Sequence, residues 1–325
     1  MTMTGRHIAV IGAGAWGTAL ACAAARTGAR VTLWMRSPVA PEVRELPRLP
    51  GIRLPDTVHV TGEFPTQADL VLLVVPVQTA RQVSAALEQS LAPGIPVITC
   101  CKGLEKGTSL LPLDVLTETM PGRPTAVLSG PNFAIEVAQG LPAAATLASE
   151  DLSLAQHLAS QLNSSSFRLY ASQDTAAVQL AGAAKNVVAI GAGIVIGAGL
   201  GENGRAALIT RAVAEIARLA EALGGRASTL AGLSGVGDLI LTCTGRGSRN
   251  YSLGVELGEG RSLADILASR TTVAEGALTA PALVALAQSL NVQVPIIETV
   301  THLLSEKLTI DEARSLLLDR PPTVE

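Results

Sequence analysis

The stretch HIAVIGAGAWGTAL, residues 7–20, decides how this chain folds. It opens with a short apolar run, Ile8–Ile11, which is typical of a strand buried in a sheet. Glycines follow, and an alanine-rich segment from about Trp16 to Thr27 then predicts a helix that stops at Gly28. A strand, a glycine turn and a helix in this order are typical of a βαβ unit, so we expect the chain to begin with a parallel sheet.

The glycines form the pattern Gly12-x-Gly14-x-x-Gly17. Gly12 permits a tight turn, Gly14 lets the backbone approach a pyrophosphate, and Gly17 allows the helix to pack closely on the strand. The N-terminus of that helix would then face the anion. The hexapeptide alone is a weak signal, but its position between a strand and a helix predicts dinucleotide binding.

Strand and helix patterns alternate through the first half of the chain. Further strands are expected at Arg30–Trp34, Asp69–Val75, Ile95–Cys101, Ala126–Ser129, Ala143–Leu147 and Phe167–Tyr170, with a helix at Thr79–Leu91. This alternation predicts an α/β domain of the Rossmann type, with a doubly wound, mostly parallel sheet. We assign residues 1–173 to this dinucleotide-binding domain.

The second half of the chain carries long apolar, helical patterns and almost no strand-like runs. Helices are expected at Thr175–Ile196, Gly204–Ala222, Leu263–Leu267, Ala280–Leu290, Ile297–Leu304 and Ile310–Leu317. The pattern predicts an all-α domain at residues 174–325, which we assign to substrate binding and catalysis.

Composition limits the classes of function. Hydrophobic residues make up 48% of the 325 residues and charged residues only 16%, which excludes a disordered chain. The formal net charge of −3 argues against a nucleic-acid partner, because such proteins normally carry a basic surplus. The four cysteines show neither a C-x-x-C pair nor metal-like spacing with the four histidines, so we expect reduced thiols, a cytoplasmic protein and no metal site.

Two apolar runs raise the question of membrane insertion. Glycines interrupt the first, Ile8–Ala25, at the turn described above. The second, Val187–Gly201, has fifteen residues of which five are glycine, and a membrane-spanning helix needs about twenty apolar residues. We therefore expect neither run to enter a membrane.

The end of the second expected strand bears on the choice of cofactor. Enzymes that use NAD place an acidic residue there to bind the ribose diol, but this sequence has Trp34-Met-Arg-Ser37. Arg36 lies where a 2′-phosphate would bind, so we expect NADP(H) to be accepted alongside NAD(H). The alternative is that Arg36 is only a solvated cation.

Three further groups of polar residues follow expected strands or enter apolar helices. Lys102 and the turn Ser129–Ala134 come at the carboxyl ends of strands, where ligands bind in open α/β sheets. Lys185 enters an apolar helix, which is costly for a charge unless it has a partner or reaches solvent. The polar loop expected at residues 245–250 contains Arg249, which can bind a phosphate through two hydrogen bonds or simply be solvated.

Several of these motifs occur together in a known order. They are GAGAWGTAL (12–20), CKGL (101–104), SGPNFA (129–134), KNVVAIG (185–191), GVGDL (235–239) and SRN (248–250). With these motifs, the chain resembles the bacterial type of NAD(P)-dependent glycerol-3-phosphate dehydrogenase from about residue 7 to residue 318. Ala15 stands where that family often has serine, and Asn132 where serine or threonine is commoner.

The resemblance implies reversible reduction of dihydroxyacetone phosphate, a small phosphorylated substrate, to sn-glycerol 3-phosphate for phospholipid synthesis. It implies that Lys185 donates and accepts the proton. Substrate contacts implied by the resemblance are Lys102, Gly130, Asn132, Lys185, Asp238, Ser248, Arg249 and Asn250. Implied cofactor contacts, besides Gly12, Gly14 and Gly17 of the glycine loop, are Trp16, Arg36, Lys102, Ala134, Arg249, Val273 and Glu275.

Two other functions stay open on the residues alone. A related two-domain dehydrogenase could act on 3-hydroxy acids or on a sugar phosphate, although a substrate without phosphate would not need Arg249. A catalytically silent dinucleotide sensor is the second alternative, and the presence of Lys185 and Asp238 counts against it. The exposed faces expected for the helical domain are compatible with a homodimer.

Overall fold

The computed structural model of the chain describes residues 5–37, 39, 40, 42–245, 247–270 and 274–318. The chain divides into two compact units. Unit 1 comprises Met1–Lys102 and Leu110–Gln179, and unit 2 comprises Gly103–Ser109 and Leu180–Glu325.

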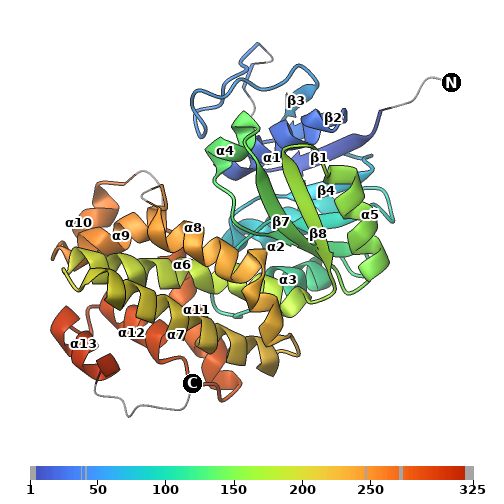
Figure 1. Cartoon of the computed structure of the whole chain (residues 1–325). Helices are drawn as coiled ribbons and strands as arrows, with labels where there is room; N and C mark the ends of the chain where they lie inside the picture. The colour runs from blue at the N-terminus through green and yellow to red at the C-terminus, as the bar shows by residue number, and fades with distance from the viewer. Residues whose placement is uncertain (1–4, 38, 41, 246, 271–273, 319–325) are drawn as a thin grey trace. The chain divides into compact units, whose positions relative to one another are not determined.

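Unit 1 contains an eight-stranded sheet, drawn in blue to green in Figure 1. Its strands are β1 His7–Ile11, β2 Arg30–Trp34, β3 Val58–Thr61, β4 Leu70–Leu73, β5 Val97–Thr99, β6 Thr125–Ser129, β7 Ala143–Ala148 and β8 Phe167–Ser172. Their order across the sheet is β3-β2-β1-β4-β5-β6-β7-β8. Every neighbouring pair is parallel except β6 and β7, which confirms the predicted doubly wound, mostly parallel sheet.

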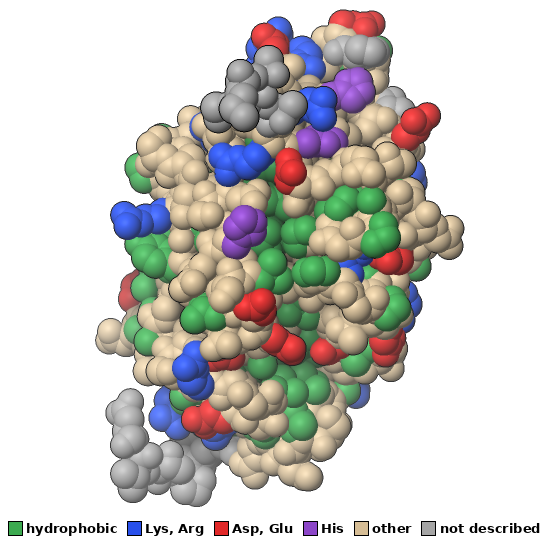
Figure 2. Space-filling view, turned by 90° about the vertical axis from the view of Figure 1, so that its right-hand side faces the viewer, with side chains coloured by type: hydrophobic (Ala, Val, Ile, Leu, Met, Phe, Trp, Pro, Cys, Tyr) green, Lys and Arg blue, Asp and Glu red, His purple; other side chains and the backbone are tan. Residues whose placement is uncertain are grey.

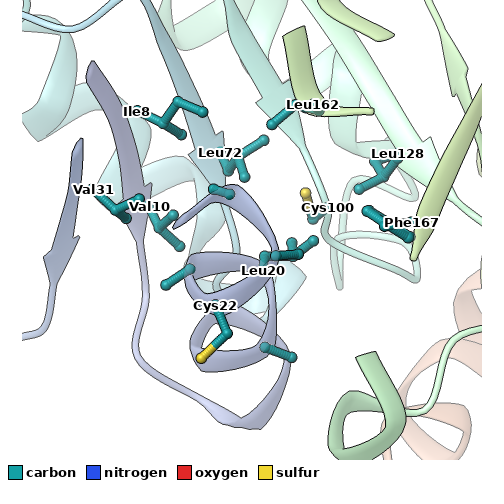
Figure 3. Close-up of a cluster of buried hydrophobic side chains, with 14 of the residues drawn as sticks. Ile8, Val10, Leu20, Cys22, Val31, Leu72, Cys100, Leu128, Leu162 and Phe167 are labelled. Atoms are coloured by element: carbon teal, nitrogen blue, oxygen red, sulfur yellow. The ribbon is translucent and has the colours of Figure 1, made fainter. Parts of the chain in front are cut away.

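Helices cover both faces of this sheet. They are α1 Ala15–Arg26, α2 Val77–Glu88, α3 Pro112–Thr119, α4 Ala134–Gln139 and α5 Leu152–Leu162. Buried side chains of α1, α4 and α5 join one apolar cluster, and those of α2 and α3 join another. Figure 3 shows the first cluster, where Leu20 of α1 lies among strand residues such as Val10 and Leu128. The sheet is thereby buried on both faces, as near-continuous apolar strands require.

Several elements of unit 1 were not expected from the sequence. Strand β3 has only four residues and follows a proline-rich segment, so its apolar pattern was too short to stand out. Helix α5 does carry a sequence signal: the Asp151 carboxylate accepts hydrogen bonds from the backbone N–H groups of Ser153 and Leu154, as an N-cap does. The expected strand Asp69–Val75 is confined to β4, because the chain turns into α2 directly afterwards.

Unit 2 is helical, and its described residues form no strand. Its helices are α6 Thr175–Gly197, which begins in unit 1, then α7 Gly201–Ala222, α8 Asp238–Thr244, α9 Arg249–Gly258, α10 Leu263–Ala268, α11 Glu275–Ser289, α12 Pro295–Leu304 and α13 Ile310–Leu318, with short helical turns at Ala227–Ala231 and Leu233–Gly237. Helix α6 is long and apolar enough to cross a membrane, but 89% of its most apolar window is buried within the protein. That burial is typical of a core helix.

Candidate active site and cofactor loop

The predicted dinucleotide loop joins β1 to α1 in unit 1. Gly12 has a φ of +117°, and a Cβ placed on it would lie 2.4 Å from the Val74 carbonyl oxygen. A Cβ on Gly17 would lie 1.7 Å from the Gly12 carbonyl oxygen, so both positions exclude a side chain. Around Gly14 no atom lies within 4 Å of such a Cβ. Gly12 thus serves the turn and Gly17 the packing of the helix, whereas Gly14 leaves open space beside the backbone.

The N-terminus of α1 suits an anion. Gly14 is the N-cap and supplies no side-chain hydrogen bond, and the first turn contains no acidic residue. The first N–H groups of a helix lack partners within the helix, and the helix dipole adds partial positive charge at this end. A pyrophosphate can therefore bind beside Gly14 without repulsion from a carboxylate.

Buried polar atoms without a partner within the protein occur in α1 and at the end of β6. Among the described residues, Nε1 of Trp16, Oγ of Ser129 and Oδ1 of Asn132 are buried and make no hydrogen bond within the protein. Buried polar atoms normally have partners, so these groups, of which Trp16 belongs to the glycine loop motif, indicate a missing polar ligand. These residues fit a dinucleotide, which would offer hydrogen-bonding groups to each of them. Ser129 begins the turn that the sequence pointed to, but it was not among the predicted contacts.

Lys102 and Gly130 meet in the same region. Lys102 follows β5, and its ammonium donates a hydrogen bond to the Gly130 carbonyl oxygen at 3.3 Å. A Cβ on Gly130 would lie 2.8 Å from Cα of Ala145, so the turn after β6 packs directly on β7. Unit 1 thus brings Lys102 and Gly130, two of the predicted substrate contacts, within hydrogen-bond distance of each other.

The remaining cofactor candidates lie at element ends. Arg36 is exposed two residues beyond the last residue of β2, Ala134 is the first residue of α4, and Glu275 is the first residue of α11 in unit 2. Val273 lies outside the described residues.

Lys185 of α6 has a buried acidic partner in unit 2. Its ammonium lies 2.6 Å from Oδ1 of Asp238 and 3.0 Å from Oγ1 of Thr242. The Thr242 hydroxyl in turn donates to the same carboxylate oxygen at 3.2 Å. The Lys185 side chain is 10% exposed and that of Asp238 is 0% exposed, so the ion pair is shielded from bulk water. The carboxylate and the Thr242 hydroxyl hold the ammonium in one place.

Helix α8 explains how Asp238 and Thr242 come together. The turn Leu233–Gly237 leads into α8, and Asp238 and Thr242 stand four residues apart on that helix, on one face. This i, i+4 spacing is a feature of the sequence that predicts contact between the side chains of Asp238 and Thr242, a contact that the sequence analysis missed. The next residue, Cys243, is buried, and burial raises the pKa of its thiol to about 12. The thiol is therefore neutral near pH 7 and is no candidate for a base.

The expected polar loop at residues 245–250 is partly wrong. Ser248 is the N-cap of α9, its hydroxyl accepting a hydrogen bond from the Tyr251 N–H, and Arg249 and Asn250 are the first helical residues. Serine at an N-cap satisfies an N–H that the helix leaves open, which is why the loop ends here. Arg249 is exposed, whereas Ser248 and Asn250 are buried.

Asn250 is held from two sides. Its side-chain N–H donates to Oδ1 of Asn186 at 2.9 Å, and its Oδ1 accepts from the Gly276 N–H at 3.1 Å. These contacts fix the orientation of the Asn250 amide and tie the residue after Lys185 to the start of α11. Asn186, which follows Lys185 directly, is a second residue of this region that the sequence analysis missed.

Glycines let α6 and α9 approach at backbone distance. A Cβ on Gly193 would lie 2.2 Å from the Tyr251 carbonyl oxygen, and a Cβ on Gly254 would lie 2.0 Å from that of Ile190. Only glycine fits at such contacts. The close packing places Asn186 on α6 within hydrogen-bond distance of Asn250 on α9.

Positive and negative side chains are mixed on the face of the molecule that Figure 2 shows. Figure 2 shows cationic and anionic side chains interspersed on the face in view, without the broad basic area that a nucleic-acid surface presents. Among the described residues no group of three or more His, Cys, Asp or Glu side chains could hold a metal ion.

Comparisons with known proteins cover both units. Residues 7–155 match the family described as NAD-dependent glycerol-3-phosphate dehydrogenase N-terminus, and residues 174–315 match its C-terminus. The chain is 77% identical over 319 residues to glycerol-3-phosphate dehydrogenase [NAD(P)+] of Gluconobacter oxydans, covering 98% of each chain. It is 46% identical over 328 residues to the enzyme of the same name from Parvibaculum lavamentivorans, covering 99% of this chain and 98% of the other.

A solved structure agrees with the sequence relatives. The crystal structure of glycerol-3-phosphate dehydrogenase from Coxiella burnetii superposes with a TM-score of 0.91 at 35% identity, covering 97% of this chain and 99% of that one. The similarity extends over essentially the whole length of both chains.

Proposed function

Because this chain belongs to the NAD-dependent glycerol-3-phosphate dehydrogenase family, an NAD(P)-dependent enzyme family with a Rossmann nucleotide-binding domain, we propose that it catalyses the reversible reduction of dihydroxyacetone phosphate to sn-glycerol 3-phosphate. The observation that carries this proposal is the buried pair of Lys185 and Asp238 beside the first turn of α9 in unit 2. A cationic proton donor near further polar groups is what the reduction of a phosphorylated ketone requires.

The cofactor, when bound, supplies the hydride for reduction or accepts it for oxidation. In unit 1 we assign Gly12, Gly14, Trp16, Gly17, Arg36, Lys102 and Ala134 to cofactor contacts, and in unit 2 Arg249, Val273 and Glu275. The open space at Gly14 and the unpartnered Nε1 of Trp16 support this assignment.

Lys185 donates and accepts the proton in this proposal. Negative charge grows on the C2 oxygen of the substrate as the carbonyl is reduced, and the Lys185 ammonium stabilises that charge and then donates a proton to the oxygen. In the reverse direction the amine takes the proton from the hydroxyl. Asp238 and Thr242 orient the Lys185 side chain through the hydrogen bonds at 2.6 and 3.0 Å.

The other assigned residues hold the substrate. In unit 2 these are Asp238, Ser248, Arg249 and Asn250, and in unit 1 they are Lys102, Gly130 and Asn132. Arg249 is suited to the phosphate, because its exposed guanidinium can donate two parallel hydrogen bonds to phosphate oxygens. The N-terminus of α9 adds partial positive charge at the same end.

We further propose that the reaction runs in the cytoplasm and supplies sn-glycerol 3-phosphate for glycerophospholipid synthesis. The exposed faces of the helical unit are compatible with a homodimer, which sedimentation of the purified protein would test.

The experiment for the proposed reaction follows NADPH absorbance with two substrates. We expect rapid oxidation of NADPH with dihydroxyacetone phosphate and a much lower kcat/KM with unphosphorylated dihydroxyacetone. Equal kcat/KM values for the two ketones would contradict the assignment of a phosphate site.

A further inference from the structure

One face of α9 is joined by a set of hydrogen bonds to Arg270, which lies two residues beyond the end of α10. Arg270 donates from Nη1 to the Arg249 carbonyl oxygen at 2.9 Å and from Nη2 to Oγ of Ser252 at 3.2 Å, and Nη2 also pairs with Glu256. The Ser252 hydroxyl donates to the same Arg249 carbonyl at 3.1 Å. We call these four residues the Arg270 brace.

The brace spans the helix lengthwise. Residues 249, 252 and 256 are spaced i, i+3 and i+7, so they lie on one face of α9. A guanidinium is planar and rigid, and its fork can engage acceptors on successive turns without much loss of side-chain entropy. The Arg270 side chain is only 17% exposed, so its contacts are less screened than those of a free surface pair.

The opposite side of the same first turn is held by the contacts of Asn250 described above. Asn186 and Gly276 fix its amide, while Arg270 holds the carbonyl of the preceding residue, Arg249. The first two residues of α9 are therefore each held by contacts within the protein. The exposed guanidinium is the part of Arg249 that is available to bind a ligand.

We propose that Arg270 is a positioning residue for phosphate binding: it holds the backbone of Arg249 so that the Arg249 guanidinium is presented in one arrangement. This inference rests on the proposed function, which assigns Arg249 to the substrate. Loss of the brace keeps the Arg249 side chain itself but removes the contacts that hold the N-terminal end of α9, so the position of that side chain is no longer fixed. Misplacing a binding group by about 1 Å is enough to weaken its contact strongly.

The test compares Arg270→Met with Arg261→Met in the full-length enzyme. Arg261 pairs with the same carboxylate, that of Glu256, so its replacement removes an ion pair and one positive charge but leaves the contacts of Arg270 with Arg249 and Ser252. We expect Arg270→Met to raise the KM for dihydroxyacetone phosphate by about tenfold while kcat changes by less than about twofold. Arg261→Met should leave both constants near those of the wild type.

Two further variants make the result specific. Arg270→Lys keeps the charge and most of the stem but lacks the fork, so it should raise KM in the same direction even if Arg270→Met folds poorly. In an Arg249→Ala background, Arg270→Met should add less than about a twofold change in KM, because the two residues act through one contact. NADPH binding, measured by fluorescence, should match the wild type in Arg261→Met, and any loss in the variants at position 270 should not exceed the loss in Arg249→Ala, because Arg249 is also assigned to the cofactor.

The outcomes separate the two proposals. If Arg249→Ala raises KM but Arg270→Met and Arg270→Lys do not, or if the effects of positions 249 and 270 on KM add fully, the brace has no positioning role. If Arg249→Ala leaves KM unchanged, the phosphate assignment in the proposed function is wrong and the role of Arg270 falls with it.

Discussion

The ammonium of Lys185 lies 2.6 Å from Oδ1 of Asp238, whose side chain is completely buried. The two residues come from α6 and α8, which are 53 residues apart in the sequence at this contact. A buried ion pair is costly to form, and removing one partner leaves the other charge in a poorly solvated place. The pair therefore has consequences for stability as well as for catalysis, and the two can be separated.

Replacing Lys185 by methionine should reduce kcat by about 10²- to 10⁴-fold, the usual contribution of a general acid. The dissociation constant of NADPH, measured by fluorescence, should change little, because Lys185 is assigned to the substrate and to the proton and not to the cofactor. A variant that retains more than about a third of the wild-type kcat would show that another group supplies the proton.

The same variant should lower the free energy of unfolding by about 3–5 kcal/mol, because Asp238 loses the ammonium. In the double variant Lys185→Met with Asp238→Asn the buried charge is gone, so stability should recover in part while kcat stays low. Urea denaturation of the single and double variants measures this. A double variant no more stable than Lys185→Met would contradict the importance of the pair for stability.

Gly14 and Gly17 should respond differently to the same substitution. Gly17→Ala places a Cβ 1.7 Å from a backbone oxygen, so we expect a loss of about 1–3 kcal/mol or more in the free energy of unfolding. Gly14→Ala meets no atom within 4 Å, and its stability should stay within about 1 kcal/mol of the wild type. Its Kd for NADPH should nevertheless rise by about tenfold, since the added methyl occupies the space for the pyrophosphate.

Thermal unfolding without cofactor and fluorescence titration with NADPH measure the two effects separately. Unaltered NADPH affinity in Gly14→Ala would mean that the cofactor does not approach the backbone there.

Periodicity and glycine spacing predicted much of the fold for a physical reason. The strand β2 has the predicted bounds, because its apolar residues are buried in the sheet and its neighbours are turn residues. Strand β3 was missed since four residues after a proline-rich segment give too short a pattern. The start of α9 was missed although Ser248 is a standard N-cap residue, because the two glycines and two arginines of residues 245–250 favoured a loop.

The residues of the candidate site also divide into those that the sequence could predict and those that it could not. The partnership of Lys185 with Asp238 could be suspected from the sequence, because a lysine in an apolar helix needs a partner. Thr242 could have been placed beside Asp238 by its i, i+4 spacing. Asn186 could not be assigned a contact in this way, because it is neutral and its contact depends on how α9 packs against α6. Packing of that kind is set by contacts such as those at Gly193 and Gly254, which no local pattern reveals.

Replacing Arg249 by alanine removes the exposed guanidinium and keeps the backbone carbonyl that Arg270 binds. Loss of a charge-assisted phosphate contact should reduce kcat/KM for dihydroxyacetone phosphate by about ten- to a hundredfold. The kcat/KM for unphosphorylated dihydroxyacetone should change much less, which makes that substrate the internal control. A variant that saturates with the phosphorylated substrate as the wild type does would show that Arg249 is only solvated.

Cofactor choice should depend on Arg36. This residue is exposed just beyond β2, where enzymes specific for NAD carry an acid that binds the ribose diol and repels a 2′-phosphate. With a cation there, we expect both cofactors to be used and NADPH to be favoured at limiting concentration. Arg36→Asp should reverse that preference, since it adds repulsion against the phosphate and an acceptor for the free diol.

The measurement is the ratio of kcat/KM for NADPH to that for NADH. Arg30 offers a matched control, because it is an exposed arginine at the first residue of the same strand, at the opposite end of the sheet from Arg36. Arg30→Asp changes the net charge by the same amount but should leave the ratio unchanged, since its effect on the phosphate is distant and screened. If Arg36→Asp gives the same ratio as the wild type and Arg30→Asp, Arg36 is a solvated cation and another group must recognise the ribose.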